Sequence, residues 1–277
     1  MLKLGGKIFI PNDSTLKDEI FEEMHSSILA GHPGSAKTLE LISRHFFFPD
    51  MKQFVINKVT KCHVCQVDKS VTRSKDNQVI PIAVSLEPFQ SISFDIVSSL
   101  PKSINKYDSV LVVIDRFSKY SYFIPISISI TAAEIIDLLI NHIFKIHGFP
   151  VEIMSDRDPR WTSNIFTNFM KSINIKQSMS TSYHPQSDGS SERVIRSLIE
   201  YIRHYVKELD DKSKWDSLFD SAHVAYNNRI HSATGFSPSF LVFNRQINLP
   251  FNLQSKPVKS ASLYVEEKIN ESIRSYS

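Results

Sequence analysis

The fold is decided by two stretches, Ser91-Ile-Ser-Phe-Asp-Ile-Val97 and Val110-Leu-Val-Val-Ile114. At this part of the chain the pattern changes from one typical of helices to one typical of strands. In the first stretch apolar and polar residues alternate, so its isoleucines and phenylalanine share one face of a strand and Asp95 lies on the other. The second stretch is continuously apolar, which is typical of a buried strand. The sequence therefore predicts a sheet built around these two segments.

Further elements follow on the C-terminal side of this pair. Three more strands are predicted at residues 122–126, 151–154 and 175–179. Helices are predicted at residues 132–146, 164–172, 190–207 and 215–228. Three strands followed by alternating helix and strand indicate an α/β fold, a mixed five-stranded sheet flanked by helices.

The pattern divides the chain into four segments. Residues 1–70 read as a small helical unit, with a short strand at residues 7–11 and helices on either side of Pro33-Gly34. Residues 71–88 are polar and proline-punctuated, as in a linker. Residues 89–250 form the α/β core, and residues 251–277 are a polar tail with a predicted helix at 263–273.

Composition sets only broad limits on function. The 277 residues are 42% hydrophobic, and 32 basic against 29 acidic residues give a net charge of +3, which neither requires nor excludes nucleic acid. The chain has no apolar run of about eighteen residues that could span a membrane, and its N-terminus lacks a signal-peptide core. We expect a soluble, intracellular protein.

Two histidines and the two cysteines of the chain form a metal-ligand pattern within the first segment. The cysteines are three positions apart, where metal ligation is more common than a disulfide. Four nitrogen and sulfur donors are what a closed tetrahedral zinc site requires, and a unit this small needs such a site to fold. The alternative donors are His45 and His63, of which His63 is expected to point away. The predicted zinc ligands are His25, His32, Cys62 and Cys65.

Three acids in the core suggest a second metal site. Asp95 lies on a predicted strand, Asp156 at a strand end and Glu192 in the first turn of a helix. The Asp-x35-Glu spacing alone is weak, because about one such pair is expected by chance in this chain. Clustered carboxylates favour Mg²⁺ and repel one another without a cation. Competing acids, more often turn or cap residues, are Asp115, Asp158 and Asp188.

The helix that carries Glu192 has an apolar stripe and a basic flank. The predicted core stripe comprises Ile195, Leu198, Ile202 and Tyr205. The cations on the flank beside Glu192, facing a phosphate backbone, are Arg196, Arg203 and Lys207. The alternative is a surface helix with an ordinary Glu192–Arg196 pair.

Several short motifs resemble those of one protein family. They are His25-Ser-Ser-Ile-Leu-Ala-Gly-His32-Pro-Gly, Lys37-Thr38, Phe48-Pro49, Cys62-His-Val-Cys65-Gln66, Ser93-Phe-Asp95, Val112-Val-Ile-Asp115-Arg-Phe-Ser-Lys119, His147-Gly-Phe-Pro150, Ser155-Asp156-Arg157-Asp158, Tyr183-His-Pro-Gln-Ser-Asp-Gly189, Glu192-Arg193, Tyr226-Asn227 and Thr234-Gly-Phe-Ser-Pro238. Over about residues 7–250 the chain resembles the integrase of gypsy-type long-terminal-repeat retrotransposons, and more distantly retroviral integrases.

The resemblance implies an HHCC zinc-binding domain followed by an RNase H-like catalytic core. It implies structural Zn²⁺, catalytic Mg²⁺ or Mn²⁺ held by Asp95, Asp156 and Glu192, and a structural role for Asp115. It also implies trimming of DNA 3′ ends and strand transfer to target DNA by two-metal phosphoryl transfer. The loop at residues 183–189 would position DNA ends, and the DNA contacts implied there and at the start of the helix are His184, Gln186 and Arg193. The family works in the nucleus as a homo-oligomer, a dimer or tetramer, on DNA rather than at a membrane.

The chain also departs from the family. Ser190 stands where glutamine is usual, Ile195 where asparagine is frequent and Phe48 where tryptophan is common. The usual C-terminal DNA- or chromatin-binding domain is not found by Ser277, which predicts a fragment or a truncated, domesticated copy. The alternative function is therefore a domesticated integrase that binds DNA or partners without catalysis. A weaker alternative is an RNase H-type nuclease.

Overall fold

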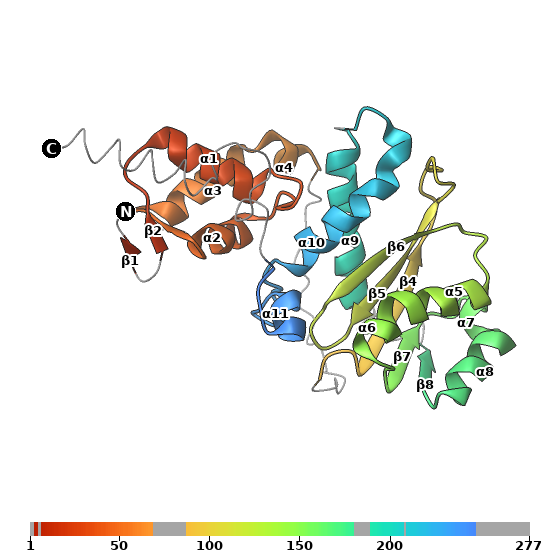
Figure 1. Cartoon of the computed structure of the whole chain (residues 1–277). Coiled ribbons are helices and arrows are strands. Elements are labelled where there is room, and N and C mark those ends of the chain that lie inside the picture. The colour runs from red at the N-terminus through yellow and green to blue at the C-terminus, as the bar shows by residue number, and fades with distance from the viewer. Residues whose placement is uncertain (1–2, 5–6, 69–86, 180–188, 208, 248–277) are drawn as a thin grey trace.

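The computed structural model describes residues 3–4, 7–68, 87–179, 189–207 and 209–247, and the side chains of residues 7–68, 87–179, 194–207 and 209–247 (Figure 1). Two bodies are visible, an N-terminal helical unit and a larger α/β core. The first contains β1 (Lys3–Leu4), β2 (Lys7–Phe9), α1 (Ser14–His25), α2 (Ser35–Ser43), β3 (Phe46–Phe47), α3 (Met51–Lys61) and α4 (His63–Asp68).

The helical unit packs around a small apolar core. Asp13 begins α1 by accepting hydrogen bonds from the backbone N–H groups of Thr15 and Leu16. Phe21, Ile42 and Phe48 are among the buried residues where α1, α2 and α3 meet. A small sheet in the order β1-β2-β3 closes one side. Such a limited core explains why a metal site is needed to stabilise it.

The α/β core contains a mixed five-stranded sheet in the order β6-β5-β4-β7-β8, which confirms the predicted fold. β4 pairs antiparallel with β5 and parallel with β7, and β7 pairs parallel with β8. Every residue of β5 is buried, as its apolar run predicts. The strands are β4 (Ser91–Val97), β5 (Ser109–Asp115), β6 (Ser121–Ile126), β7 (Glu152–Ser155) and β8 (Lys176–Met179).

Helices cover both faces of this sheet (Figure 1). On one face Ile92 and Phe94 pack against α5 (Ala132–Leu139) and α8 (Asn164–Ser172). On the other face Val110 and Val112 pack against α9 (Gly189–Val206) and α10 (Phe219–Asn227). The remaining helical segments are η1 (Ile140–Phe144), α6 (Lys145–His147), α7 (Pro159–Thr162), η2 (Lys212–Leu218) and α11 (Pro238–Phe243). None of the described helices is long and apolar enough to cross a membrane.

Several predicted boundaries differ from the structure. The predicted helix at residues 132–146 contains a π-helical segment at Ile140–Phe144, and the one at 215–228 begins as a 3₁₀ helix. Periodicity could not predict either, because both change backbone hydrogen bonding without changing which residues are apolar. Most of the predicted linker 71–88, the tail 251–277 and its helix at 263–273 lie outside the described residues, so the domain boundaries stay predictions.

The predicted apolar stripe of α9 was wrong by one position at two places. The fully buried residues are Val194, Leu198, Tyr201 and Tyr205, whereas Ile195 and Ile202 are only half-buried. The stripe is rotated because the tyrosines near the C-terminal end of α9 lie against the N-terminal unit as well as the core.

Candidate active site and zinc centre

The structure brings the four predicted zinc ligands together from different elements. His25 is the last residue of α1, His32 follows in a loop, Cys62 follows α3 and Cys65 lies in α4. One donor atom from each lies within 4.8 Å of the other three. His25, His32 and Cys65 are buried, so the donors converge in an enclosed space.

The separations of these donors fit a tetrahedral zinc ion. With Zn–N near 2.0–2.1 Å and Zn–S near 2.3 Å, two nitrogens should lie about 3.4 Å apart and a nitrogen and a sulfur about 3.6 Å apart. The Nε2 of His25 is 3.4 Å from the Nδ1 of His32. The Sγ of Cys65 is 3.4 Å and 3.8 Å from these two nitrogens. The Sγ of Cys62 is 3.6 Å from the Nδ1 of His32. The geometry and the donor set therefore fit zinc.

Thr38 orients one of the ligands. The Nδ1 of His25 lies 3.2 Å from the Thr38 Oγ1, and the Thr38 hydroxyl donates to the Pro33 carbonyl at 3.1 Å. Zinc on Nε2 leaves the proton on Nδ1, so His25 donates to Thr38 and each polar atom is satisfied. Sequence reasoning noted Thr38 only as part of a motif and did not predict this role.

The two alternative histidines do not join the site. His63 is exposed on α4, as expected for a residue between two ligands that points away. His45 is outside the converged group and its ring lies 6.3 Å from that of Phe46. Burial lowers the pKa of His45, with a smaller contribution from Arg44.

The core places two of the predicted acids next to each other. Phe94 on β4 pairs with Ser155 on the parallel strand β7, so Asp95 and Asp156 are the next residues along adjacent strands. Neighbouring strands lie about 4.8 Å apart, which is close enough for two carboxylates to share cations. The sequence could identify each strand but not that these two strands are neighbours.

The Asp156 carboxylate is held by two donors. The Nε1 of Trp161 donates to its Oδ1 at 2.8 Å, and the backbone N–H of Asp158 donates to the same oxygen at 3.2 Å. Trp161 is fully buried among Phe94 and Phe166, so its indole N–H is fixed. Sequence reasoning missed Trp161, because only the fold shows that it reaches back to Asp156.

The third acid lies on the helix beside these strands. Glu192 is in the first turn of α9, and α9 packs against β4, the strand that carries Asp95. The side chains of Glu192 and Arg193 lie outside the described residues, as do His184 and Gln186. The roles of these four residues therefore stay predictions.

The competing acids have other partners. Asp115 is fully buried and accepts hydrogen bonds from the backbone of Phe89 and from the backbone and hydroxyl of Ser118, so it organises the turn after β5. Asp158 begins α7 and pairs with Arg160, and the hydrogen bonds from Arg160 lower its pKa. Asp188 lies outside the described residues.

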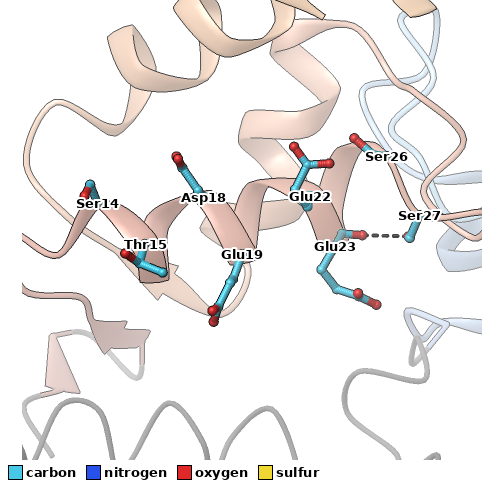
Figure 2. Close-up of a pocket in the computed structure, with 8 residues that line it drawn as sticks. All are labelled: Ser14, Thr15, Asp18, Glu19, Glu22, Glu23, Ser26 and Ser27. Atoms are coloured by element: carbon cyan, nitrogen blue, oxygen red, sulfur yellow. Dashed lines mark hydrogen bonds between the residues drawn. The ribbon is translucent and has the colours of Figure 1, made fainter.

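Charge is distributed unevenly over the two bodies. Arg196 and Arg203 are exposed on α9 and Lys207 is exposed directly after its end, which suits the predicted phosphate contacts. In contrast, Figure 2 shows carboxylates spread along α1, and Lys58 pairs with one of them at 2.7 Å. This face would repel a phosphate backbone. The acids are Asp18, Glu19, Glu22 and Glu23.

Comparisons with known proteins agree with this arrangement. Residues 12–71 match the family described as Integrase zinc binding domain, and residues 86–185 match the family described as Integrase core domain. The Transposon Tf2-3 polyprotein of Schizosaccharomyces pombe (strain 972 / ATCC 24843) is 31% identical over 236 residues, which are 85% of this chain and 18% of the polyprotein. The Tf2-4 polyprotein of the same strain matches equally. The chain thus spans less than a fifth of these curated relatives.

A solved structure shows the same fold at low identity. It is the simian T-cell lymphotropic virus intasome in complex with PP2A regulatory subunit B56 gamma, with a TM-score of 0.51 and 21% identity over 86% of this chain and 79% of that chain. A zinc-binding domain followed by an RNase H-like core defines the class as integrase, within the DDE-type polynucleotidyl transferases. The chain is similar over 85% of its length to these gypsy-type retrotransposon polyproteins, which confirms the resemblance.

Proposed function

We propose that this chain is the integrase segment of a retrotransposon polyprotein and that it trims DNA 3′ ends and joins them to target DNA. The observation that carries the proposal is the position of Asp95 and Asp156 at adjacent parallel strands, next to the helix that carries Glu192. A protein that only bound DNA would have no physical need to gather acids beside a phosphate backbone, because they would repel it.

The three acids would act together as metal ligands. Asp95, Asp156 and Glu192 would hold two Mg²⁺ or Mn²⁺ ions, which activate the attacking oxygen and stabilise the leaving oxygen. Trp161 and the backbone of Asp158 keep the Asp156 carboxylate in place, so it need not reorganise when DNA binds.

DNA is the proposed partner, and Arg196, Arg203 and Lys207 would contact its phosphates, with Arg193, His184 and Gln186 nearer the reacting end. Joining two element ends requires more than one copy of the chain, so we propose a homo-oligomer, a dimer or tetramer. We propose the nucleus as the location, because the proposed target is chromosomal DNA.

A branched DNA that mimics the strand-transfer product tests the proposal, because resealing it requires the active site but little end sequence. We expect Mg²⁺- or Mn²⁺-dependent resealing that is abolished by Glu192→Gln and by Asp95→Asn. Glu19→Gln is the matched control, since it removes an exposed carboxylate on the distant acidic face of α1. No resealing by folded, zinc-loaded, DNA-binding protein would instead favour a domesticated binding protein, and cleavage of RNA in a hybrid without DNA joining would favour a nuclease.

A further inference from the structure

The loop that joins the two histidine ligands of zinc lies against the catalytic core. We call residues 26–31 the His25–His32 loop. It is tightly folded, because the backbone N–H of His32 donates to the His25 carbonyl at 2.8 Å and that of Gly31 donates to the Ser27 carbonyl at 2.9 Å. Gly31 and His32 both have positive φ, +70° and +48°. The separation of the two ligands therefore depends on the exact path of this loop.

Two tyrosines of α9 hold the loop from the outside. The Tyr201 hydroxyl donates to the Ile28 carbonyl at 2.8 Å, and the Tyr205 hydroxyl donates to the Ser27 carbonyl at 2.8 Å. Both side chains are only 3% exposed. Burial raises the pKa of Tyr201, so its hydroxyl remains a donor at neutral pH. The core thus supplies hydrogen bonds that the loop carbonyls would otherwise make with water.

The contact is close as well as polar. A Cβ at Gly31 would lie 2.9 Å from a ring carbon of Tyr201, so only glycine allows this approach. The ring of His204, also on α9, lies 5.4 Å from that of the ligand His32. One side of the zinc centre is therefore formed by residues of α9.

A second contact joins the zinc-binding unit to the core. Arg44, at the end of α2, donates to the side-chain and backbone oxygens of Asn228 at 3.0 Å and 2.8 Å. Two hydrogen bonds to Glu40 hold its guanidinium in place. Because α2 also carries Thr38, the hydrogen-bond partner of His25 is on a helix that this contact joins to the core.

We propose that Tyr201 and Tyr205 are positioning residues for the zinc centre. Through their hydrogen bonds, bound zinc also stabilises α9, the helix that carries Glu192. Zinc fixes the His25–His32 loop in the form that accepts both hydroxyls, and the hydroxyls favour the form that binds zinc. Coupling of this kind is reciprocal. The free energy by which the two tyrosine contacts strengthen zinc binding equals the free energy by which zinc stabilises these contacts. The inference rests on the zinc site and does not depend on the proposed reaction.

The size of the effect follows from the two hydrogen bonds. Loss of one neutral hydrogen bond that exists only in the zinc-loaded form should raise the zinc dissociation constant about 2- to 10-fold, and loss of both about 5- to 100-fold. Tyr→Phe retains the ring and therefore most of the packing. Tyr122→Phe is a matched control, because its hydroxyl makes an equally short hydrogen bond, 2.7 Å to His147, within the core.

The test is competition for zinc between a chromophoric chelator and the whole chain, without DNA. We expect weaker zinc binding by Tyr201→Phe and Tyr205→Phe, a larger effect in the double variant, and a change below about twofold in Tyr122→Phe. Equal zinc affinity of the double variant and the unchanged chain would overturn the proposal. If the double variant does not fold, zinc affinity is compared between the unchanged chain, the two single variants and Arg44→Gln. Arg44→Gln removes the guanidinium of the second contact.

Hydrogen exchange provides a readout that simple destabilisation would not reproduce. Removal of zinc from the unchanged chain should accelerate amide exchange in α9, and the acceleration should be smaller in the double variant, where the connection is already broken. Exchange in α9 that does not respond to zinc removal would also overturn the proposal.

Discussion

Replacement of Thr38 by valine tests how the zinc centre is held. Valine has nearly the same shape, but it removes the oxygen that accepts from the Nδ1 of His25 and the hydroxyl that donates to Pro33. Thr38 is fully buried, so water cannot replace either group. A buried donor left without a partner costs about 1–3 kcal/mol, which corresponds to a decrease in zinc affinity of about 5- to 150-fold. Loss of such an outer-shell partner typically costs about 10- to 100-fold in metal affinity, in agreement with that range.

Chelator competition on Thr38→Val, Thr38→Ser and the unchanged chain measures this difference. Serine retains the hydroxyl, so Thr38→Ser should bind zinc within about threefold of the unchanged chain, while Thr38→Val should bind at least about fivefold more weakly. Similar weakening in both variants would attribute the effect to the lost methyl group and its packing. Unchanged binding by Thr38→Val would refute the role of Thr38 in orienting His25.

Three further predictions concern other parts of the molecule. Trp161→Phe removes the indole donor from Asp156 but keeps the aromatic packing, so the Mg²⁺ concentration needed for resealing should rise about tenfold, measured by metal titration, with zinc affinity unchanged. Gly31→Ala introduces a side chain at φ +70° and against the ring of Tyr201, so it should lower the stability of the zinc-binding unit by about 1–3 kcal/mol in denaturant unfolding followed by bound zinc, whereas an unchanged midpoint would show that the loop can move. Burial lowers the pKa of His223 to about 4. Between about pH 4 and 6.5 the unfolded state therefore binds more protons at this histidine than the folded state does. The contribution of neutral His223 to the free energy of unfolding thus decreases as the pH falls through this window. His223→Gln should remove up to about 3 kcal/mol of that pH dependence in core unfolding measured at pH 4.5 and 7, and an identical pH dependence in both proteins would contradict it.

Sequence patterns predicted five strands in the core, and the apolar signature is clearest in the two that lie at its centre. The strand at 110–114 is a continuous apolar run and the strand at 91–97 alternates, and both occur close to where they were predicted. Periodicity contains no information on the order of strands within the sheet. The pairing of β4 with β7, which brings Asp95 beside Asp156, could be seen only in the structure. The same holds for Trp161, whose contact with Asp156 depends on the turn that follows β7.

The zinc ligands were predictable for a different reason. Zinc requires a particular number and type of donor, and this chain has only two cysteines, so spacing and chemistry leave few alternatives. The partner of a ligand is less restricted, because any buried hydroxyl or carbonyl can serve. Thr38 therefore could not be identified from residue type, although it lies in the same helix that the sequence predicted.

The shifted stripe of α9 shows where a single-helix pattern reaches its limit. Ile195 and Ile202 are as apolar as any core residue, so a periodicity of 3.6 residues favours them equally well. The structure instead buries Val194 and Tyr201, together with the predicted Tyr205. The C-terminal half of α9 faces two neighbours, the sheet and the His25–His32 loop, which explains why both tyrosines are buried. Tyrosine suits this position, since its ring packs on the core while its hydroxyl donates to a carbonyl of the other unit. α9 packs against both the sheet and the zinc-binding unit, so the pattern of its buried residues reflects both contacts. A pattern calculated for one buried face therefore does not predict it.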